Sequence, residues 1–202
     1  MTQRGLRELK REATAHALAD AAFELAKSRG LDGFVIEDVV ERAGYSRRTF
    51  ANHFSCKEEA VASVVHREAD AAAAALEDMP ADMPLLDAVQ AVLKRQLTAD
   101  VFARLREVVD LAHRYPSLEP HVLSVQNRMR QAAQASLRWV AGDRYSATYV
   151  ALLFGAVYGA VTAALEGDVD VRIPGQEGPS HPGSVDYPEF LDQTFSYLRS
   201  GF

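Results

Sequence analysis

The apolar residues of this chain recur with the period of an α-helix along most of its length. Within residues 18–29 they fall at i, i+3, i+4 and i+7, and residues 36–43 repeat that spacing. Glycine follows both segments, where a helix is expected to end. Further helices fit residues 85–99, 101–114, 118–140, 145–166 and 188–200. Alternation typical of strands is missing, and DVDVRI (168–173) is too short and isolated for a sheet. The pattern predicts an all-α fold.

Two breaks interrupt the helical pattern. Ser55 and Glu58 predict a capping box that opens a helix, which then runs through an alanine-rich stretch to a break at 80–84. Residues 167–188 hold four of the chain's eight prolines, and a connection of this length is usually functional or disordered. Two interpretations stay open for it. It is either an idle surface loop or a flap in which Tyr187 or His181 contacts a ligand.

Composition narrows the class of protein. The chain has 202 residues, of which 48% are hydrophobic, so it can bury a real core. Its one cysteine excludes an internal disulfide, and its charged N-terminus lacks the apolar run of a secretory signal, so we expect a cytoplasmic protein. The net charge of −6 is the sum of +2 over residues 1–57 and −8 over residues 58–202. This asymmetry suggests that the two parts have different tasks.

The basic, aromatic segment GYSRRTFANHF (44–54) fits the second half of a helix–turn–helix. Ser46 can cap a short helix that follows the turn at Gly44. Phe50 and Phe54 would bury one side of that helix. This leaves Arg47, Arg48 and Thr49 facing outward at its N-terminal end. Arginine there can pair with guanine in the major groove. The alternative is an ordinary solvated helix face above an ordinary core.

The run GLDGFVIEDVVERAGYSRRTFANHFSCKEEAV (30–61) resembles the DNA-binding domain of the tetracycline-repressor (TetR) family of bacterial transcriptional regulators. The matching features are the EDV–ERAG helix, the S-R-x-T-F recognition helix, the HF pair and the K-E-E helix start. The resemblance implies that Arg47 and Arg48 read bases, and that Lys57 holds a phosphate. It further implies contacts to the DNA from Tyr45, Ser46, Thr49, Asn52 and His53.

The sequence departs from the family pattern at four positions. Val35 stands where a capping threonine is frequent, and Val40 replaces a small residue inside the same helix. Ala51 replaces a frequent tyrosine, and Cys56 occupies the usual cap of the fourth helix, whose role Ser55 is expected to assume. These changes bear on the phosphate contacts more than on the fold.

Residues 147–165 carry no charged side chain. A helix that is apolar on all sides is buried or lies in a membrane, and this one just reaches the length of a membrane span. We favour a central helix covered on several faces, in which glycines permit close approach of a second subunit. The resemblance implies that the last two helices form the dimer interface, with Gly155, Tyr158, Gly159, Phe190 and Phe195 as candidates.

The helices between these two parts could enclose a ligand. The candidate lining mixes apolar bulk with a few polar groups, as binding pockets do. It consists of Phe102, Leu105, Val109, His113, Gln126, Met129, Trp139, Tyr149 and Phe154. Each of these could instead be an ordinary core residue. The spacing of His113 and His121 matches no common metal site. We find no motif of an enzyme and expect no cofactor.

Taken together, the sequence predicts a helix–turn–helix DNA-binding domain over residues 1–57 and a helical effector-binding and dimerisation domain over 58–202. The predicted function is a transcriptional regulator, a repressor released from its DNA operator by a small-molecule ligand. The predicted partners are double-stranded DNA, that ligand and a second copy of the chain, with no membrane. The rival hypothesis is an all-helical ligand-binding or scaffold protein whose helix–turn–helix has lost its affinity for DNA.

Overall fold

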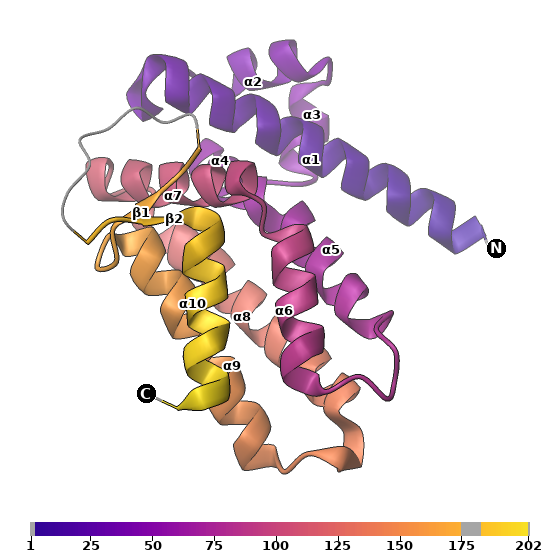
Figure 1. Ribbon diagram of the computed structural model, residues 1–202. Helices are drawn as coiled ribbons and strands as arrows, with labels where there is room; N and C mark the ends of the chain where they lie inside the picture. Colours follow the sequence, from indigo (N-terminus) through magenta and orange to yellow (C-terminus); the bar gives the residue numbers. More distant parts are fainter. Residues whose placement is uncertain (1–2, 175–182, 202) are drawn as a thin grey trace. The chain divides into compact units, whose positions relative to one another are not determined.

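The computed structural model describes residues 3–174 and 183–201, and most of them are helical (Figure 1). The predicted all-α fold is confirmed. The α-helices are α1 (Gln3–Arg29), α2 (Ile36–Ala43), α3 (Arg47–Ala51), α4 (Lys57–Ala62), α5 (His66–Glu77), α6 (Leu85–Gln96), α7 (Ala99–Arg114), α8 (Glu119–Ala141), α9 (Ala147–Glu166) and α10 (Tyr187–Ser200). Short 3-10 turns are η1 (Leu31–Gly33), η2 (Ser63–Val65) and η3 (Gly142–Arg144). The strands are β1 (Val171–Arg172) and β2 (Val185–Asp186).

The chain divides into two compact units. The first consists of residues 1–67 and 110–127, and the second of residues 68–109 and 128–202. Helices α7 and α8 each have residues in both units. The predicted boundary at residue 57 separates a DNA-binding part from an effector-binding part rather than two compact units, and it stays a prediction.

Helix α1 organises the first unit. Its second half buries Leu18, Phe23 and Leu25, and it packs against α2 and α4. The helix is longer than the apolar period over 18–29 predicted, because it begins at Gln3. Residues 5–13 of this helix are exposed and consist mainly of good helix formers, so intrinsic propensity extends the helix where no buried face is required. Leu6 and Leu9 stand in this exposed part.

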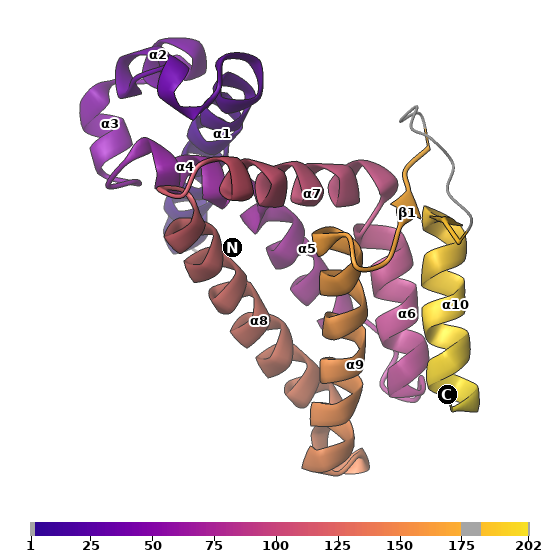
Figure 2. The same ribbon diagram turned by 90° about the vertical axis from the view of Figure 1, so that its left-hand side faces the viewer.

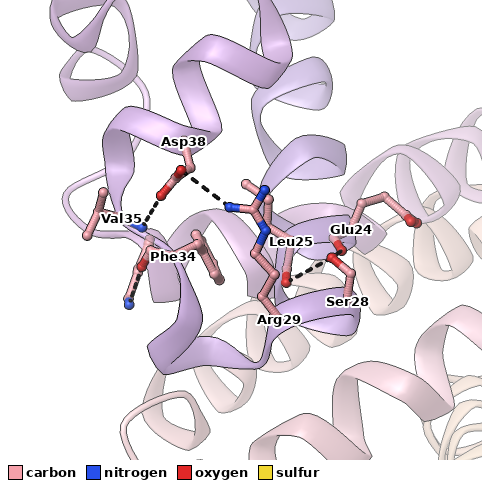
Figure 3. Close-up of polar contacts among 8 residues, drawn as sticks. Glu24, Leu25, Ser28, Arg29, Phe34, Val35 and Asp38 are labelled. Carbon is pink, nitrogen blue, oxygen red and sulfur yellow. Dashed lines mark hydrogen bonds and ion pairs between the residues drawn. The ribbon is translucent and has the colours of Figure 1, made fainter.

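Helix α2 begins without a side-chain cap, as expected from the valine at that position. Val35 is the N-cap residue, and the Asp38 carboxylate accepts a hydrogen bond of 2.8 Å from its backbone nitrogen (Figure 3). Asp38 also forms an ion pair of 3.4 Å with Arg29 at the end of α1. One carboxylate therefore ties the start of α2 to α1. The helix ends at Gly44, whose φ of 74° is a left-handed conformation that favours glycine.

The second unit is built around α6, α9 and α10. Its core contains Leu85 of α6, Leu153 of α9 and the completely buried Phe195 of α10. Helix α10 packs against both α6 and α9 (Figure 2). Tyr145 supports the start of α6, since its hydroxyl accepts a hydrogen bond of 3.0 Å from the backbone nitrogen of Leu85.

Two residues of the segment DVDVRI, Val171 and Arg172, form a strand, so the prediction that the segment joins no sheet is wrong. Val171 pairs with Val185, and Arg172 pairs with Asp186, in parallel. An ion pair of 2.9 Å between the Arg172 and Asp186 side chains reinforces the second of these pairs. Strand β1 buries Val171, with Ile173 just beyond it, beside Phe102 and Phe190. Tertiary packing thus fixes a pairing that is too short for a sequence pattern to reveal.

Candidate nucleic-acid interface

Helices α2 and α3 form the predicted helix–turn–helix. The turn closes through a hydrogen bond of 2.9 Å from the Tyr45 backbone nitrogen to the Val40 carbonyl. Phe50 and Phe54 are both buried, with ring centroids 5.6 Å apart, so one side of α3 is anchored in the first unit. The other side of α3 is left on the surface of that unit (Figure 2).

Ser46 caps α3 as the sequence predicted. Its hydroxyl oxygen accepts a hydrogen bond of 3.1 Å from the backbone nitrogen of Thr49. The Ser46 and Thr49 hydroxyls lie 2.9 Å apart and share a further hydrogen bond. This local network fixes the first turn of a five-residue helix that is too short to be stable by itself. It also fixes the backbone from which the Arg47 and Arg48 side chains project.

The two arginines at the start of α3 are exposed but differ in their surroundings. Arg47 forms an ion pair of 2.7 Å with Glu37 in the first turn of α2. Within the part of the chain that the structure describes, the Arg48 guanidinium has no ion pair or hydrogen bond. Arg48 therefore presents its full set of donors to solvent. The sequence did not predict this difference between neighbours.

Lys57 has a structural role that the sequence analysis missed. Its ammonium donates hydrogen bonds to the carbonyl oxygens of Leu31, at 2.6 Å, and Phe34, at 2.9 Å. The same nitrogen lies 4.9 Å from the centroid of the Phe34 ring. These contacts tie the start of α4 to the segment between α1 and α2. Only one of the three ammonium hydrogens remains for a phosphate.

The remaining predicted DNA contacts lie around the ends of α3. Tyr45 and Asn52 are exposed, and His53 is half-buried at the C-terminal side of the helix. Burial lowers the pKa of the His53 imidazole from its ordinary value, and the positive charge of Arg11 lowers it further. A lowered pKa favours the neutral imidazole of the chain without DNA, which has one hydrogen-bond donor and one acceptor.

The cap of α4 is Cys56, so the prediction that Ser55 assumes this role is wrong. The Cys56 sulfur accepts a hydrogen bond of 3.4 Å from the backbone nitrogen of Glu59. The Glu59 carboxylate in turn accepts hydrogen bonds from the backbone nitrogen and hydroxyl of Ser55, at 2.8 and 2.7 Å. The Cys56 sulfur also lies 3.6 Å from Nε2 of His121, a contact within the first unit that no sequence pattern predicts.

A hollow of about 350 Å³ opens beside the start of α3. The starts of α2, α3 and α4 surround it, and its lining carries charges of both signs. The lining residues are Val35, Ile36, Glu37, Arg47, Ser55, Cys56, Lys57 and Glu58. The base-reading candidate Arg47 and the phosphate-binding candidate Lys57 therefore share one depression of the surface.

The candidate ligand-lining residues differ widely in burial. Phe102 is fully buried against Tyr187, with ring centroids 4.9 Å apart, and Val109 is buried. The half-buried members are Leu105, Gln126, Met129 and Phe154, and the exposed ones are His113, Trp139 and Tyr149. Trp139 exposes 69% of its surface, so it lines no interior cavity of its own unit. These residues belong to both compact units, and the common pocket stays a prediction.

The candidate interface residues fall into two groups. Gly155 and Gly159 lie on an exposed face of α9, and a side chain added at either would meet nothing within 4 Å. Tyr158 is half-buried and stacks on Phe154, with ring centroids 5.6 Å apart. Phe190 and Phe195 of α10 are instead buried in their own unit. Their prediction as dimer-interface residues is wrong, because α10 uses both rings to pack against its own chain.

Helix α9 is covered on fewer sides than the sequence led us to expect. Val150, Leu153 and Val157 are buried, whereas Leu152 exposes 69% of its surface and Tyr149 exposes 41%. By length and composition alone, α9 is the one helix in the described residues that could cross a membrane. A helix that packs into a core on one side passes the same test.

Tyr187 is a core residue, which corrects its placement in a flap. It is the first residue of α10, and its hydroxyl donates a hydrogen bond to the Leu97 carbonyl. Burial raises the pKa of this hydroxyl. His181, the other flap candidate, lies outside the described residues. Within residues 3–174 and 183–201, no three His, Cys, Asp or Glu side chains are grouped so that they could hold a metal ion.

Comparison with known proteins supports the interpretation of the first unit. Residues 18–64 match the family model described as bacterial regulatory proteins, tetR family. No curated protein matches the sequence significantly. The matched segment contains α2, α3 and α4 entirely, so it covers the helix–turn–helix and the hollow beside it.

Solved structures of similar fold cover nearly the whole chain. A putative TetR-family transcriptional regulator from Mesorhizobium loti superimposes with a TM-score of 0.55 and 16% identity, over 99% of this chain and 96% of that one. A TetR/AcrR-family regulator from Thermobifida fusca gives a TM-score of 0.53 and 16% identity, over 96% and 98% of the two chains. A transcriptional regulator from Rhodococcus gives 0.51 and 24% identity, over 90% and 91%. The predicted resemblance to the TetR family is therefore confirmed.

Proposed function

We propose that this TetR-like chain is a homodimeric, cytoplasmic transcriptional repressor that a small-molecule ligand releases from its DNA operator. The observation that carries the proposal is the first turn of α3. It is capped by Ser46, anchored by buried phenylalanines, and presents Arg47 and Arg48 on an exposed surface. In a helix–turn–helix this turn is the part that enters the major groove.

The proposed contacts follow from the chemistry of each side chain. Arg48, which has no partner among the described residues, would donate two hydrogen bonds to O6 and N7 of a guanine. Arg47 would read a neighbouring base. The hydroxyls of Tyr45 and Thr49 and the amide of Asn52 would bind phosphate or sugar oxygens and so set the position of the helix on the duplex.

The proposed dimer uses the exposed face of α9. Leu152, Gly155 and Gly159 lie at i, i+3 and i+7 on this face, and they are all exposed in the single chain. Small residues at this spacing allow a second helix to approach closely, and a twofold symmetric contact needs only one such face on each copy. On α10, Tyr197 exposes 54% of its surface and replaces the buried phenylalanines as our candidate.

The proposed regulation is a shift between two populations of the dimer. A ligand bound among the helices of the second unit would favour a dimer whose recognition helices no longer fit successive major grooves. The ligand must bind the two forms with different affinities, and typical coupling amounts to about 1–3 kcal/mol.

A specific observation favours the rival hypothesis of a degenerate helix–turn–helix. Val35 offers no hydroxyl at the start of α2, and the Lys57 ammonium is occupied by two carbonyls. Two expected phosphate contacts are thereby weakened. A protein with these changes could keep the fold for ligand binding alone.

Selection from a random duplex library, followed by gel-shift titration, separates the two hypotheses. The wild type should enrich a common, partly palindromic sequence. Arg48→Ala should weaken binding to the selected duplex by about 1–3 kcal/mol and relax the preference at one position of each half-site. Arg95→Ala, an exposed arginine of α6, is the matched control and should bind like the wild type. Equal losses on all duplexes would remove Arg48 from base reading, and failure of the wild type to enrich any sequence would favour the rival.

A further inference from the structure

The ion pair between Glu37 and Arg47 joins the two helices of the helix–turn–helix. The carboxylate and guanidinium lie 2.7 Å apart, and their side chains expose 57% and 74% of their surfaces. An exposed pair of this kind adds little to stability. It does bias the direction of the Arg47 guanidinium toward Glu37 while no DNA is bound. Arg48, the next residue, has no such partner among the described residues.

The hollow around this pair carries balanced charges. Glu37 and Glu58 contribute two negative charges to its lining, and Arg47 and Lys57 contribute two positive ones. The Lys57 ammonium is turned toward the carbonyls of Leu31 and Phe34. The hollow thus lies beside the recognition helix and yet offers a phosphate no net positive charge. Without the Glu37 charge, its formal charge would rise to +1.

This balance affects how Arg47 can meet DNA. A phosphate is the strongest anion on a duplex, and every sequence offers it at the same spacing. An exposed arginine whose guanidinium has no partner can bind either a base edge or a phosphate, and the phosphate is present on any DNA. A guanidinium has five N–H donors in a fixed fork, so one side can stay on Glu37 while the other faces a base edge.

We propose that Glu37 is a specificity-determining residue, whose carboxylate positions the Arg47 guanidinium toward bases and keeps it from capturing phosphates. This inference rests on the proposed DNA-binding function. It assigns Glu37 a role through Arg47, so Glu37 is a positioning residue and needs no contact with the DNA itself.

The test uses Glu37→Gln, which keeps the shape of the side chain and removes its charge. Dissociation constants are measured by fluorescence anisotropy for the duplex selected by the wild type and for a shuffled duplex of equal composition, over a series of potassium chloride concentrations. Glu37→Gln should bind the shuffled duplex about three- to tenfold more tightly, with a salt slope steeper by about 0.9 for each Arg47 that gains a phosphate. Binding to the selected duplex should not tighten, so the ratio of the two constants should fall by the same factor.

Two comparisons identify the cause. Glu41→Gln removes the same charge one turn further along α2, where the described residues show no ion pair with that side chain. It should change both duplexes equally and leave the ratio unchanged. In an Arg47→Ala background, Glu37→Gln should have no further effect on the ratio. The inference is overturned if Glu37→Gln keeps the wild-type ratio, or if its effect persists without Arg47. If the wild type itself binds the two duplexes equally, the proposed function of sequence-specific DNA binding is refuted, independently of Glu37.

Discussion

Replacement of Lys57 by methionine should destabilise the first unit, in addition to any effect on DNA. Methionine keeps the length and apolar stem of the side chain but removes the ammonium group. The structure shows what this group does, because it donates to the Leu31 carbonyl at 2.6 Å and to the Phe34 carbonyl at 2.9 Å. It also lies over the Phe34 ring. The variant therefore breaks the contact between the start of α4 and the segment that precedes α2.

The expected loss can be worked out from these contacts. A hydrogen bond with a charged partner contributes about 1.5–3 kcal/mol, and a cation that water still reaches over an aromatic ring about 0.5–1 kcal/mol. Lys57 is only half-buried, so water can replace part of what is lost at the carbonyl oxygens. We therefore expect a net loss of about 2–3 kcal/mol, below the sum of the separate terms. In a chain of this size it lowers the melting temperature by about 5–10 °C.

Thermal and urea unfolding, followed by circular dichroism, provide the measurement. Lys10→Met is the matched control, since Lys10 is an exposed lysine of α1 and surface substitutions usually change stability by less than about 0.5 kcal/mol. DNA binding of both variants is then compared well below their melting temperatures. If Lys57→Met is as stable as Lys10→Met, the ammonium does not hold these carbonyls. A loss of affinity for DNA without a loss of stability would instead assign Lys57 to phosphate binding alone.

Three further variants test other parts of the molecule. Gly155→Leu should fold normally, because an added side chain meets nothing within 4 Å in the single chain. It should weaken the proposed dimer by about 1–3 kcal/mol through overpacking. The control is Gly5→Leu, at an equally open helical glycine, and equal dimer stability of the two variants in sedimentation would place the interface elsewhere. Cys56→Ser should stabilise the chain toward urea by about 0.5–1 kcal/mol, because a hydroxyl is the stronger N-cap, and a lower urea midpoint would contradict this. The pKa of His53 is lowered in the folded state, so the unfolded chain takes up the proton first. Stability should therefore fall on acidification below pH 6.5, the ordinary pKa. His53→Asn should flatten this dependence of stability on pH, and an unchanged slope would exclude His53 as its source.

The helix–turn–helix could be predicted from the sequence because its determinants are local. The Ser46 cap acts over three residues. The left-handed Gly44 follows α2 where the apolar period stops. Phe50 of α3 and Phe54, which follows this helix, are four residues apart, and both rings pack into the same core. Each of these features depends on neighbours within one or two helical turns, so it can be predicted from the local sequence.

The contacts that the sequence did not reveal join distant parts of the chain. Lys57 binds carbonyls 26 and 23 residues before it, and Cys56 meets a histidine 65 residues after it. The position of Phe195 on one of the last two helices predicts a place in an interface, whereas its burial depends on which face of α10 meets α6 and α9. A helical period shows that a face is apolar but not what covers it.

Helix α9 shows how this ambiguity arises and what it implies. Its buried residues Val150, Leu153 and Val157 are spaced at i, i+3 and i+7, and so are the exposed residues Leu152, Gly155 and Gly159. Two apolar stripes on one helix leave no polar face, so the sequence showed no period at all. The chain covers the first stripe with its own α10 and core. An exposed stripe of this composition is costly in water, and small residues along it make it flat enough for a helix to lie against. A second copy of the same helix would meet both conditions, and for this reason we propose a dimer rather than a membrane as the explanation for the second stripe.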